Sequence, residues 1–306
     1  MITRREFIRT AGAVAAIAPC AAGDDAGIVD THTHFYDPSR PQGVPWPSPD
    51  ERWLYRTVRP ADFRKLAEPL GIRGTVVVEA SPWVEDNQWL IDLAARDPFL
   101  LGVVGNLDPL SADFAAHLKR FSANPKFRGI RVSGKQFMER GKEAAYVDAM
   151  RRLADAGLTL DLNGPSEYLA GVRALAGAVP ALRIVIDHVG GAGDPKKLTA
   201  AWRDQIRAAG ERGNVYCKVS ALAEQADAPH GEAPTSTDYY LPILDAVWAA
   251  FGEKRVVFGS NWPVSDRGTT LGKVLGIVRP YYAAKGEAAS RRYFSQNAAD
   301  VYRWPV

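Results

Sequence analysis

The sequence has few cysteines, little net charge and no long apolar run. Two cysteines among 306 residues cannot build a disulfide framework, and a net charge of +3 is too small to indicate a nucleic-acid partner. No apolar segment is long enough and free enough of charge to cross a membrane as a helix, which excludes a transmembrane protein. What is present, 46% hydrophobic and 24% charged residues, is typical of a globular domain with a sizeable core.

Two common catalytic motifs are also missing. Gly-x-Ser-x-Gly, the turn that presents the nucleophile of many serine hydrolases, does not occur. A glycine-rich stretch at 190–193 lies late in the chain and lacks the lysine and hydroxyl residue that complete a phosphate loop. These absences argue against a serine hydrolase and against a phosphate-loop nucleotide enzyme.

The first 22 residues have the pattern of an export signal. A basic head with the pair Arg4 and Arg5, followed by Phe7, precedes a short apolar stretch rich in alanine and glycine. The pattern resembles a twin-arginine signal, so we expect export to the periplasm and no membrane attachment after cleavage. Cleavage would remove three arginines and one glutamate and leave the rest of the chain nearly neutral.

Beyond residue 26 the chain alternates short apolar runs with longer amphipathic stretches. Glycine or proline marks nearly every joint, as expected of βαβ units with a parallel sheet. Eight such units predict an α/β fold, a single (β/α)8 TIM barrel over residues 27–306, in preference to a doubly wound sheet. The predicted strands are 28–34, 74–80, 100–108, 128–133, 157–164, 182–190, 214–222 and 255–262.

Alternation along each strand predicts which side chains face the barrel interior. Helix-facing positions must be apolar, so polar residues of the opposite parity point inward. On the second strand this reasoning assigns Val76 and Val78 to the helix-facing side. The interior should then collect charged and polar groups near the strand ends, a pattern typical of a functional site. They are His32, His34, Glu79, Arg131, Asp161, Asn163, Lys218 and Asn261.

Two long connections follow strands and should lie on the catalytic face of a barrel. Residues 35–59 are rich in proline and tryptophan, and residues 223–237 are polar. Trp46 and Trp53 of the first connection could stack on a sugar-like ring, or simply pack beneath the loop. We therefore expect the two connections to form walls of a pocket.

Several motifs in order resemble one family. They are IVDTHTH at 28–34, IDHVG at 186–190, CKVS at 217–220, FGSNWP at 258–263 and FSQNA at 294–298. Together they are similar to the amidohydrolase-related branch of the amidohydrolase superfamily, and most of all to lactone hydrolases of the L-fuconolactonase and 2-pyrone-4,6-dicarboxylate lactonase type. The resemblance implies a barrel hydrolase in which His32, His34 and His188 bind a divalent metal, zinc or manganese, or polarise a carbonyl group without one.

The chain departs from the family pattern at Asn261, where the resemblance implies an aspartate that activates water. An amide cannot take up a proton near neutral pH and is a weak metal ligand. The general base could then be Glu79, Asp161 or a histidine, with Asn261 orienting the water. Arg131, Lys218 and Asn163 would bind the substrate, although Lys218 could equally pair with Asp161 inside the barrel.

Three functions remain open from the sequence. The first is hydrolysis of a lactone of a sugar acid or small carboxylic acid. The second is non-oxidative decarboxylation, which the same superfamily branch also includes. The third, raised by Asn261, is ligand binding without turnover. In each case we expect a small-molecule partner and no nucleic acid, and assembly into a homo-oligomer is open.

Overall fold

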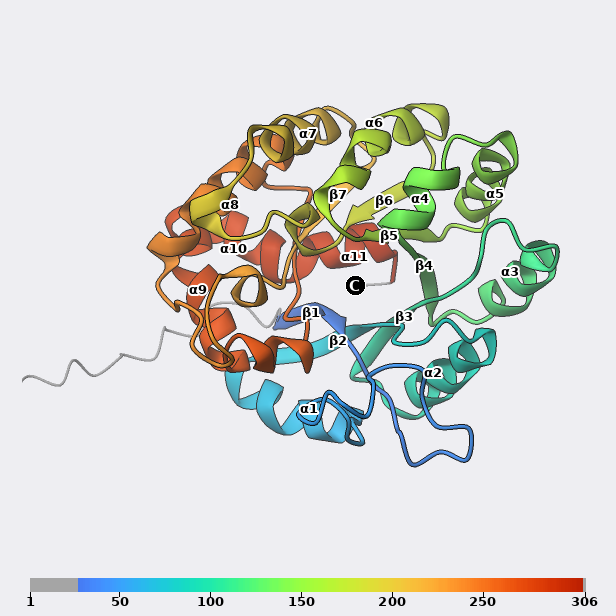
Figure 1. Cartoon of the computed structure of the whole chain (residues 1–306), viewed down its shortest axis with the longest axis horizontal. Helices are drawn as coiled ribbons and strands as arrows, with labels where there is room; N and C mark the ends of the chain where they lie inside the picture. The colour runs from blue at the N-terminus through green and yellow to red at the C-terminus, as the bar shows by residue number, and fades with distance from the viewer. Residues whose placement is uncertain (1–26, 305–306) are drawn as a thin grey trace, which may run out of the picture.

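The computed structural model describes residues 27–304, and within them eight parallel strands form one sheet in sequence order (Figure 1). The predicted signal segment, 1–22, lies outside the described residues. The strands are β1 (Ile28–Thr33), β2 (Ile72–Val78), β3 (Leu100–Gly105), β4 (Phe127–Ser133), β5 (Thr159–Asn163), β6 (Arg183–Ile186), β7 (Val215–Val219) and β8 (Val256–Phe258). Backbone contacts return from β8 to β1, where Asn261 N donates to the His32 carbonyl at 2.8 Å.

Helices surround the strands and form the outer layer of Figure 1, except α11, which lies across the middle of the barrel in this view. They are α1 (Pro60–Ala67), α2 (Val84–Arg96), α3 (Phe114–Ser122), α4 (Gly134–Arg140), α5 (Ala144–Asp155), α6 (Leu169–Ala178), α7 (Ala200–Gly210), α8 (Thr237–Phe251), α9 (Leu271–Ala284), α10 (Glu287–Arg291) and α11 (Asn297–Tyr302). In residues 27–304 none of these helices has the length and apolar composition needed to cross a membrane. The predicted (β/α)8 barrel in a single domain is confirmed.

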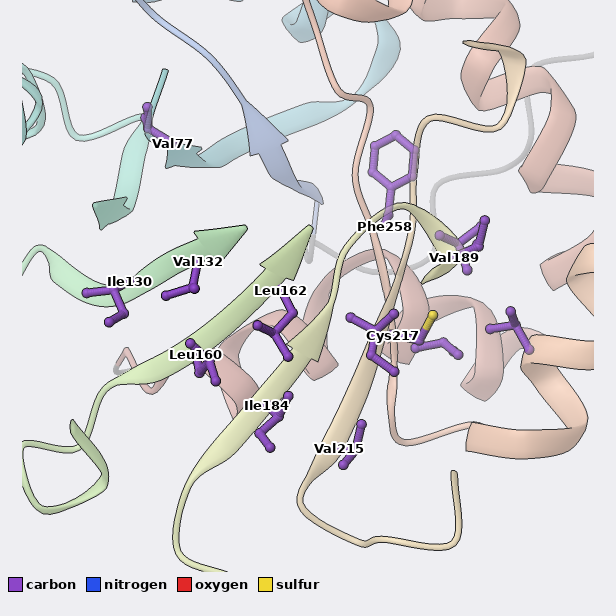
Figure 2. Close-up of a cluster of buried hydrophobic side chains, with 14 of the residues drawn as sticks. Val77, Ile130, Val132, Leu160, Leu162, Ile184, Val189, Val215, Cys217 and Phe258 are labelled. Carbon is purple, nitrogen blue, oxygen red and sulfur yellow. The ribbon is translucent and has the colours of Figure 1, made fainter. Parts of the chain in front are cut away.

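The main core lies between the strands and the helices. In α5, Tyr146, Ala149, Met150 and Leu153 are buried at spacings of three and four residues, which places them on one helix face. Figure 2 shows the strand side of this core, where residues such as Leu160 and Cys217 gather in one layer. Burying an aliphatic side chain of this kind stabilises the fold by about 1.5–3 kcal/mol.

A second, smaller apolar cluster fills the barrel interior. Val76, Val78, Val185 and Val257 meet there and pack against Tyr302 of α11. The helix-facing assignment of Val76 and Val78 is therefore wrong. The β2 sequence is apolar at every position from 76 to 78, so it contains no alternation from which its two faces could be distinguished.

Candidate active site

A cavity of about 370 Å³ opens at the carboxyl ends of the strands. Both long connections lie at this end of the barrel: Trp46 of the first lines the cavity, and Glu224 of the second contacts Asn261 in its wall. Strand ends supply the polar part of the wall. The polar lining residues are His34, Glu79, Ser81, Asn106, Arg131, Asn163, His188 and Asn261.

Three residues just beyond strand ends, where the cavity opens, have left-handed backbone conformations. His188, Ala221 and Asn261, which follow β6, β7 and β8, have φ angles of 53°, 51° and 64°. Such conformations are uncommon for residues other than glycine and concentrate at functional sites. Each breaks the strand alternation just before the chain leaves the barrel, so His188 and Asn261 face the cavity although their strands end earlier.

The three histidines of the sequence prediction lie together. The ring centroid of His32 is 5.0 Å from that of His34 and 4.4 Å from that of His188. Burial lowers the pKa of His34 to about 3 and of His188 to about 4, and it lowers the pKa of His32 well below its usual value. Because burial lowers the pKa of each ring, all three rings are neutral near pH 7. Gly259 permits the three rings to pack, because a Cβ at that position would lie 2.8 Å from the Cβ of His32.

Only His34 and His188 line the cavity; His32 lies behind them. Nδ1 of His34 is 3.0 Å from the Val78 carbonyl, and Nδ1 of His188 is 2.8 Å from the Ser220 hydroxyl. His32 is fully buried, and its Nε2 has no hydrogen-bond partner among the described residues.

Arg131 and Glu79 form an ion pair on one wall of the cavity. The Arg131 Nε donates to Glu79 Oε1 at 2.8 Å, and its guanidinium also donates to the Glu79 carbonyl at 2.7 Å. The other carboxylate oxygen of Glu79 accepts from the Ser81 backbone N–H at 2.7 Å. Both oxygens of Glu79 are thus occupied, which makes it a poor candidate for the general base and a good anchor for Arg131.

Lys218 and Asp161 lie below the cavity, sealed from solvent. The Lys218 ammonium donates to Asp161 at 2.7 Å and lies 3.1 Å from Asp187 and 3.4 Å from Nδ1 of His32. The Tyr302 hydroxyl donates to the same Asp161 oxygen at 2.8 Å. Both Lys218 and Asp161 have no exposed surface and do not line the cavity. This differs from the expected substrate contact of Lys218 and from Asp161 as a base, and it matches the alternative of an internal ion pair.

The two tryptophans are separated. Trp46 lines the main cavity, with its ring centroid 5.8 Å from that of His34. Trp53 instead lines a second hollow of about 270 Å³, where its ring centroid is 5.1 Å from that of His230. Only Trp46 can therefore contact a ligand in the main cavity as the side chains stand.

Two acidic residues at the site were not predicted as functional. Asp187 belongs to the buried cluster of Lys218; its parity was ambiguous, because strand six is apolar on both faces. Glu224 accepts a hydrogen bond from the Asn261 amide at 2.8 Å. It lies in a short 3₁₀ turn, η5 (Ala223–Gln225), inside a polar connection that has no periodicity to mark it. No sequence signal could have paired it with Asn261.

The residues as arranged do not form a ready metal site. In residues 27–304 no three His, Cys, Asp or Glu side chains are placed to hold a metal ion. The Lys218 ammonium lies beside His32, and a positive charge at that place repels a second cation. Asn261 contributes a neutral oxygen where a carboxylate would offset the metal charge. Metal binding by His32, His34 and His188 stays a prediction.

Comparison with known proteins gives the family. Residues 29–304 match the Amidohydrolase family model. An L-fucono-1,5-lactonase of Burkholderia ambifaria is 33% identical over 90% of this chain and 95% of its own length. An amidohydrolase structure from Burkholderia multivorans with bound zinc is 25% identical, with a TM-score of 0.82 over 92% of this chain and 100% of that one.

The fold likeness extends further. The structure of a putative 2-pyrone-4,6-dicarboxylic acid hydrolase from Pseudomonas putida has a TM-score of 0.68 at 21% identity, covering 90% of this chain and 97% of that one. The family model and the 33% identical relative each cover nearly all of the described barrel. The chain therefore belongs to the amidohydrolase family and is a hydrolase.

Proposed function

We propose that the chain opens a lactone of a sugar acid in the cavity at the carboxyl end of the barrel. The observation that carries the proposal is the wall itself, where two neutral histidines and an anchored arginine line one small cavity. The cavity volume suits a small molecule rather than a polymer. The relative named L-fucono-1,5-lactonase supports a sugar lactone as the substrate class.

Arg131 is the residue we assign to substrate binding. Glu79 fixes one side of its guanidinium, and the residue lines the cavity beside Asn106 and Asn163. A guanidinium held in one orientation binds a carboxylate or a pair of hydroxyls with less loss of entropy than a free side chain. Trp46 offers a flat apolar surface to the sugar ring, as tryptophan commonly does in binding sites.

The histidines are assigned to the chemistry. When the Ser220 hydroxyl donates to Nδ1 of His188, Nε2 of that ring carries the proton and can donate it to the lactone carbonyl oxygen. Water then attacks the carbonyl carbon and gives its proton to a histidine lone pair, and the ring C–O bond breaks as that proton passes to the leaving oxygen. Glu79 and Asp161 are both already paired, which leaves a histidine as the base.

The test is hydrolysis of a panel of sugar 1,4- and 1,5-lactones by the purified chain, followed as acid release. We expect one group of lactones to be opened, with kcat reduced about 100-fold or more in His34→Gln. Aromatic carboxylates are assayed beside them for loss of carbon dioxide. Decarboxylation without lactone opening would overturn the proposal.

A further inference from the structure

Asn261 stands between two groups, and its contacts fix which way its amide points. Its Nδ2 donates to Glu224 Oε1 at 2.8 Å, while its Oδ1 lies 3.3 Å from Nε2 of His34. In its ionised form the Glu224 carboxylate can only accept, so the NH₂ group must face it and the amide oxygen must face His34. The second carboxylate oxygen of Glu224 is buried and has no hydrogen-bond partner among the described residues.

The His34 ring is fixed in the same way from its other side. Its Nδ1 is 3.0 Å from the Val78 carbonyl, which can only accept a hydrogen bond, so Nδ1 carries the ring proton. In a neutral ring Nε2 is then a lone pair. His34 Nε2 and Asn261 Oδ1 are therefore two acceptors facing each other in the cavity wall, with no hydrogen between them.

We propose that Glu224 is a positioning residue, which holds the Asn261 amide so that its oxygen and His34 Nε2 together bind one water molecule through both of its hydrogens. The inference rests on the proposed function, because this water is assigned as the nucleophile. A water that donates both hydrogens to the wall has its lone pairs turned away from the wall, toward a bound lactone.

The reaction then balances on these groups. The water oxygen forms a bond to the lactone carbonyl carbon, and the carbonyl π electrons move to the carbonyl oxygen. The hydrogen facing His34 passes to Nε2 as a proton, while the other stays on the new hydroxyl group, hydrogen-bonded to Asn261. When the carbonyl re-forms, the ring C–O bond breaks and the leaving oxygen takes the proton from His34, which gives the open hydroxy acid.

The alternative amide orientation explains why Glu224 matters. Without a carboxylate behind it the Asn261 side chain can rotate by half a turn, and its NH₂ then donates directly to His34 Nε2. That hydrogen bond would occupy the Nε2 lone pair, turn the amide oxygen toward position 224 and exclude the water. An uncharged group at position 224 should therefore lower the rate of the chemical step more than it lowers substrate affinity.

The experiment is a double-mutant cycle on lactone hydrolysis with Glu224→Gln, Asn261→Ala and the combined variant. Glu224→Gln keeps the shape of the side chain, and we expect it to lower kcat about tenfold with KM nearly unchanged. In the Asn261→Ala background the same change should have no further effect, because Glu224 acts through that amide. Glu232→Gln, an exposed acid in the same connection, is the matched control and should equal the parent.

The outcomes separate the two proposals. If the parent opens lactones and Glu224→Gln leaves kcat unchanged, or lowers it equally in the Asn261→Ala background, the role of Glu224 is wrong and the proposed function stands.

NMR gives a readout that needs no activity. We expect a strongly downfield Asn261 side-chain NH, assigned by its loss in Asn261→Ala, and an unprotonated His34 Nε2. An ordinary NH shift, or a proton on that Nε2, would overturn the inference even if no lactone is hydrolysed.

Discussion

Two sets of polar side chains occupy the upper barrel, and they differ in what they are bonded to. In the sealed cluster Asp161 accepts hydrogen bonds from Lys218 and Tyr302, and Asp187 forms an ion pair with Lys218; all four side chains have almost no exposed surface. In the rim above it, His34, His188, Arg131 and Asn261 line an open cavity.

An inward-facing charge is therefore not by itself a catalytic group. Strand alternation predicts Lys218 and Asp161 of the sealed cluster as interior residues, and it predicts Arg131 and Asn261 of the rim in the same way. Pairing separates them: in the sealed cluster Lys218 is paired with Asp161 and Asp187, while the rim keeps atoms directed at a ligand. We interpret the sealed cluster as the support on which His32 and the rim rest.

Breaking the sealed cluster should destabilise the protein strongly. Lys218→Met removes the cation and leaves Asp161 and Asp187 buried without a counter-charge. We expect a loss of about 3–5 kcal/mol in the free energy of unfolding, measured by denaturant titration. Lys197→Met is the control, since its ion pair with Asp227 is mostly exposed and is worth less than about 1 kcal/mol. Equal stability of the two variants would contradict a structural role for Lys218.

Glu224 lies between the two sets, because it is partly buried but has no cation bonded to it among the described residues. Burial raises its pKa from 4.5 to about 7; Asp266, Arg267 and His230 are the charged or titratable groups near it. The folded chain thus holds this proton more tightly than the unfolded chain, and stability falls as pH rises from 4.5 to about 7. Glu224→Gln should be the more stable protein above pH 7, by at most ~3 kcal/mol, and equal to the parent at pH 4.

Thermal unfolding of Glu224→Gln and the parent at both pH values measures this difference. If the gap in stability is the same at the acidic and the alkaline value, the burial of an ionised Glu224 is not its cause.

Substitution of Arg131 tests whether the rim binds the substrate. Arg131→Lys keeps the positive charge but loses the planar fork that Glu79 fixes, so we expect KM for an acidic or hydroxylated lactone to rise about 10-fold to 100-fold. Steady-state kinetics across a lactone series measures it. Arg120→Lys, on an exposed pair with Glu85, should leave KM unchanged. A KM that stays constant in Arg131→Lys would remove Arg131 from the binding site.

A modest change in KM should distinguish the two tryptophans. Trp46→Ala should raise KM about threefold to tenfold through loss of ring stacking, because only Trp46 lines the main cavity. Trp53→Ala changes the second hollow and should leave KM as it is. If Trp53→Ala raises KM and Trp46→Ala does not, the sugar ring binds in the second hollow and not in the main cavity.

Much of the fold was predictable because most strands alternate clearly. Leu160 and Leu162 of β5 face the helices and Asp161 between them faces the interior, as their sequence indicates. The all-valine stretch of β2 carries no such signal, and its faces were reversed. Glu79 nevertheless reaches the cavity, because β2 ends at Val78 and the alternation no longer applies.

The site was predictable in its residue types and less so in its contacts. His34, His188, Arg131, Asn163 and Asn261 do meet at one cavity, since the ends of parallel strands share one edge. Which groups are sealed and which are open depends on partners far apart in sequence, such as Tyr302 with Asp161. The Glu224–Asn261 hydrogen bond depends on the path of an irregular connection, which no periodicity describes.

The proposed reaction uses side chains of the rim, and none of its steps requires a bound metal. The most direct measurement is the rate of sugar-lactone hydrolysis by the purified chain after exhaustive chelation, with metal content determined on the same sample. We expect turnover to persist when bound metal is far below stoichiometric. The proposed reaction is contradicted if turnover appears only with stoichiometric zinc or manganese, or if no lactone is opened while lactones still raise the melting temperature.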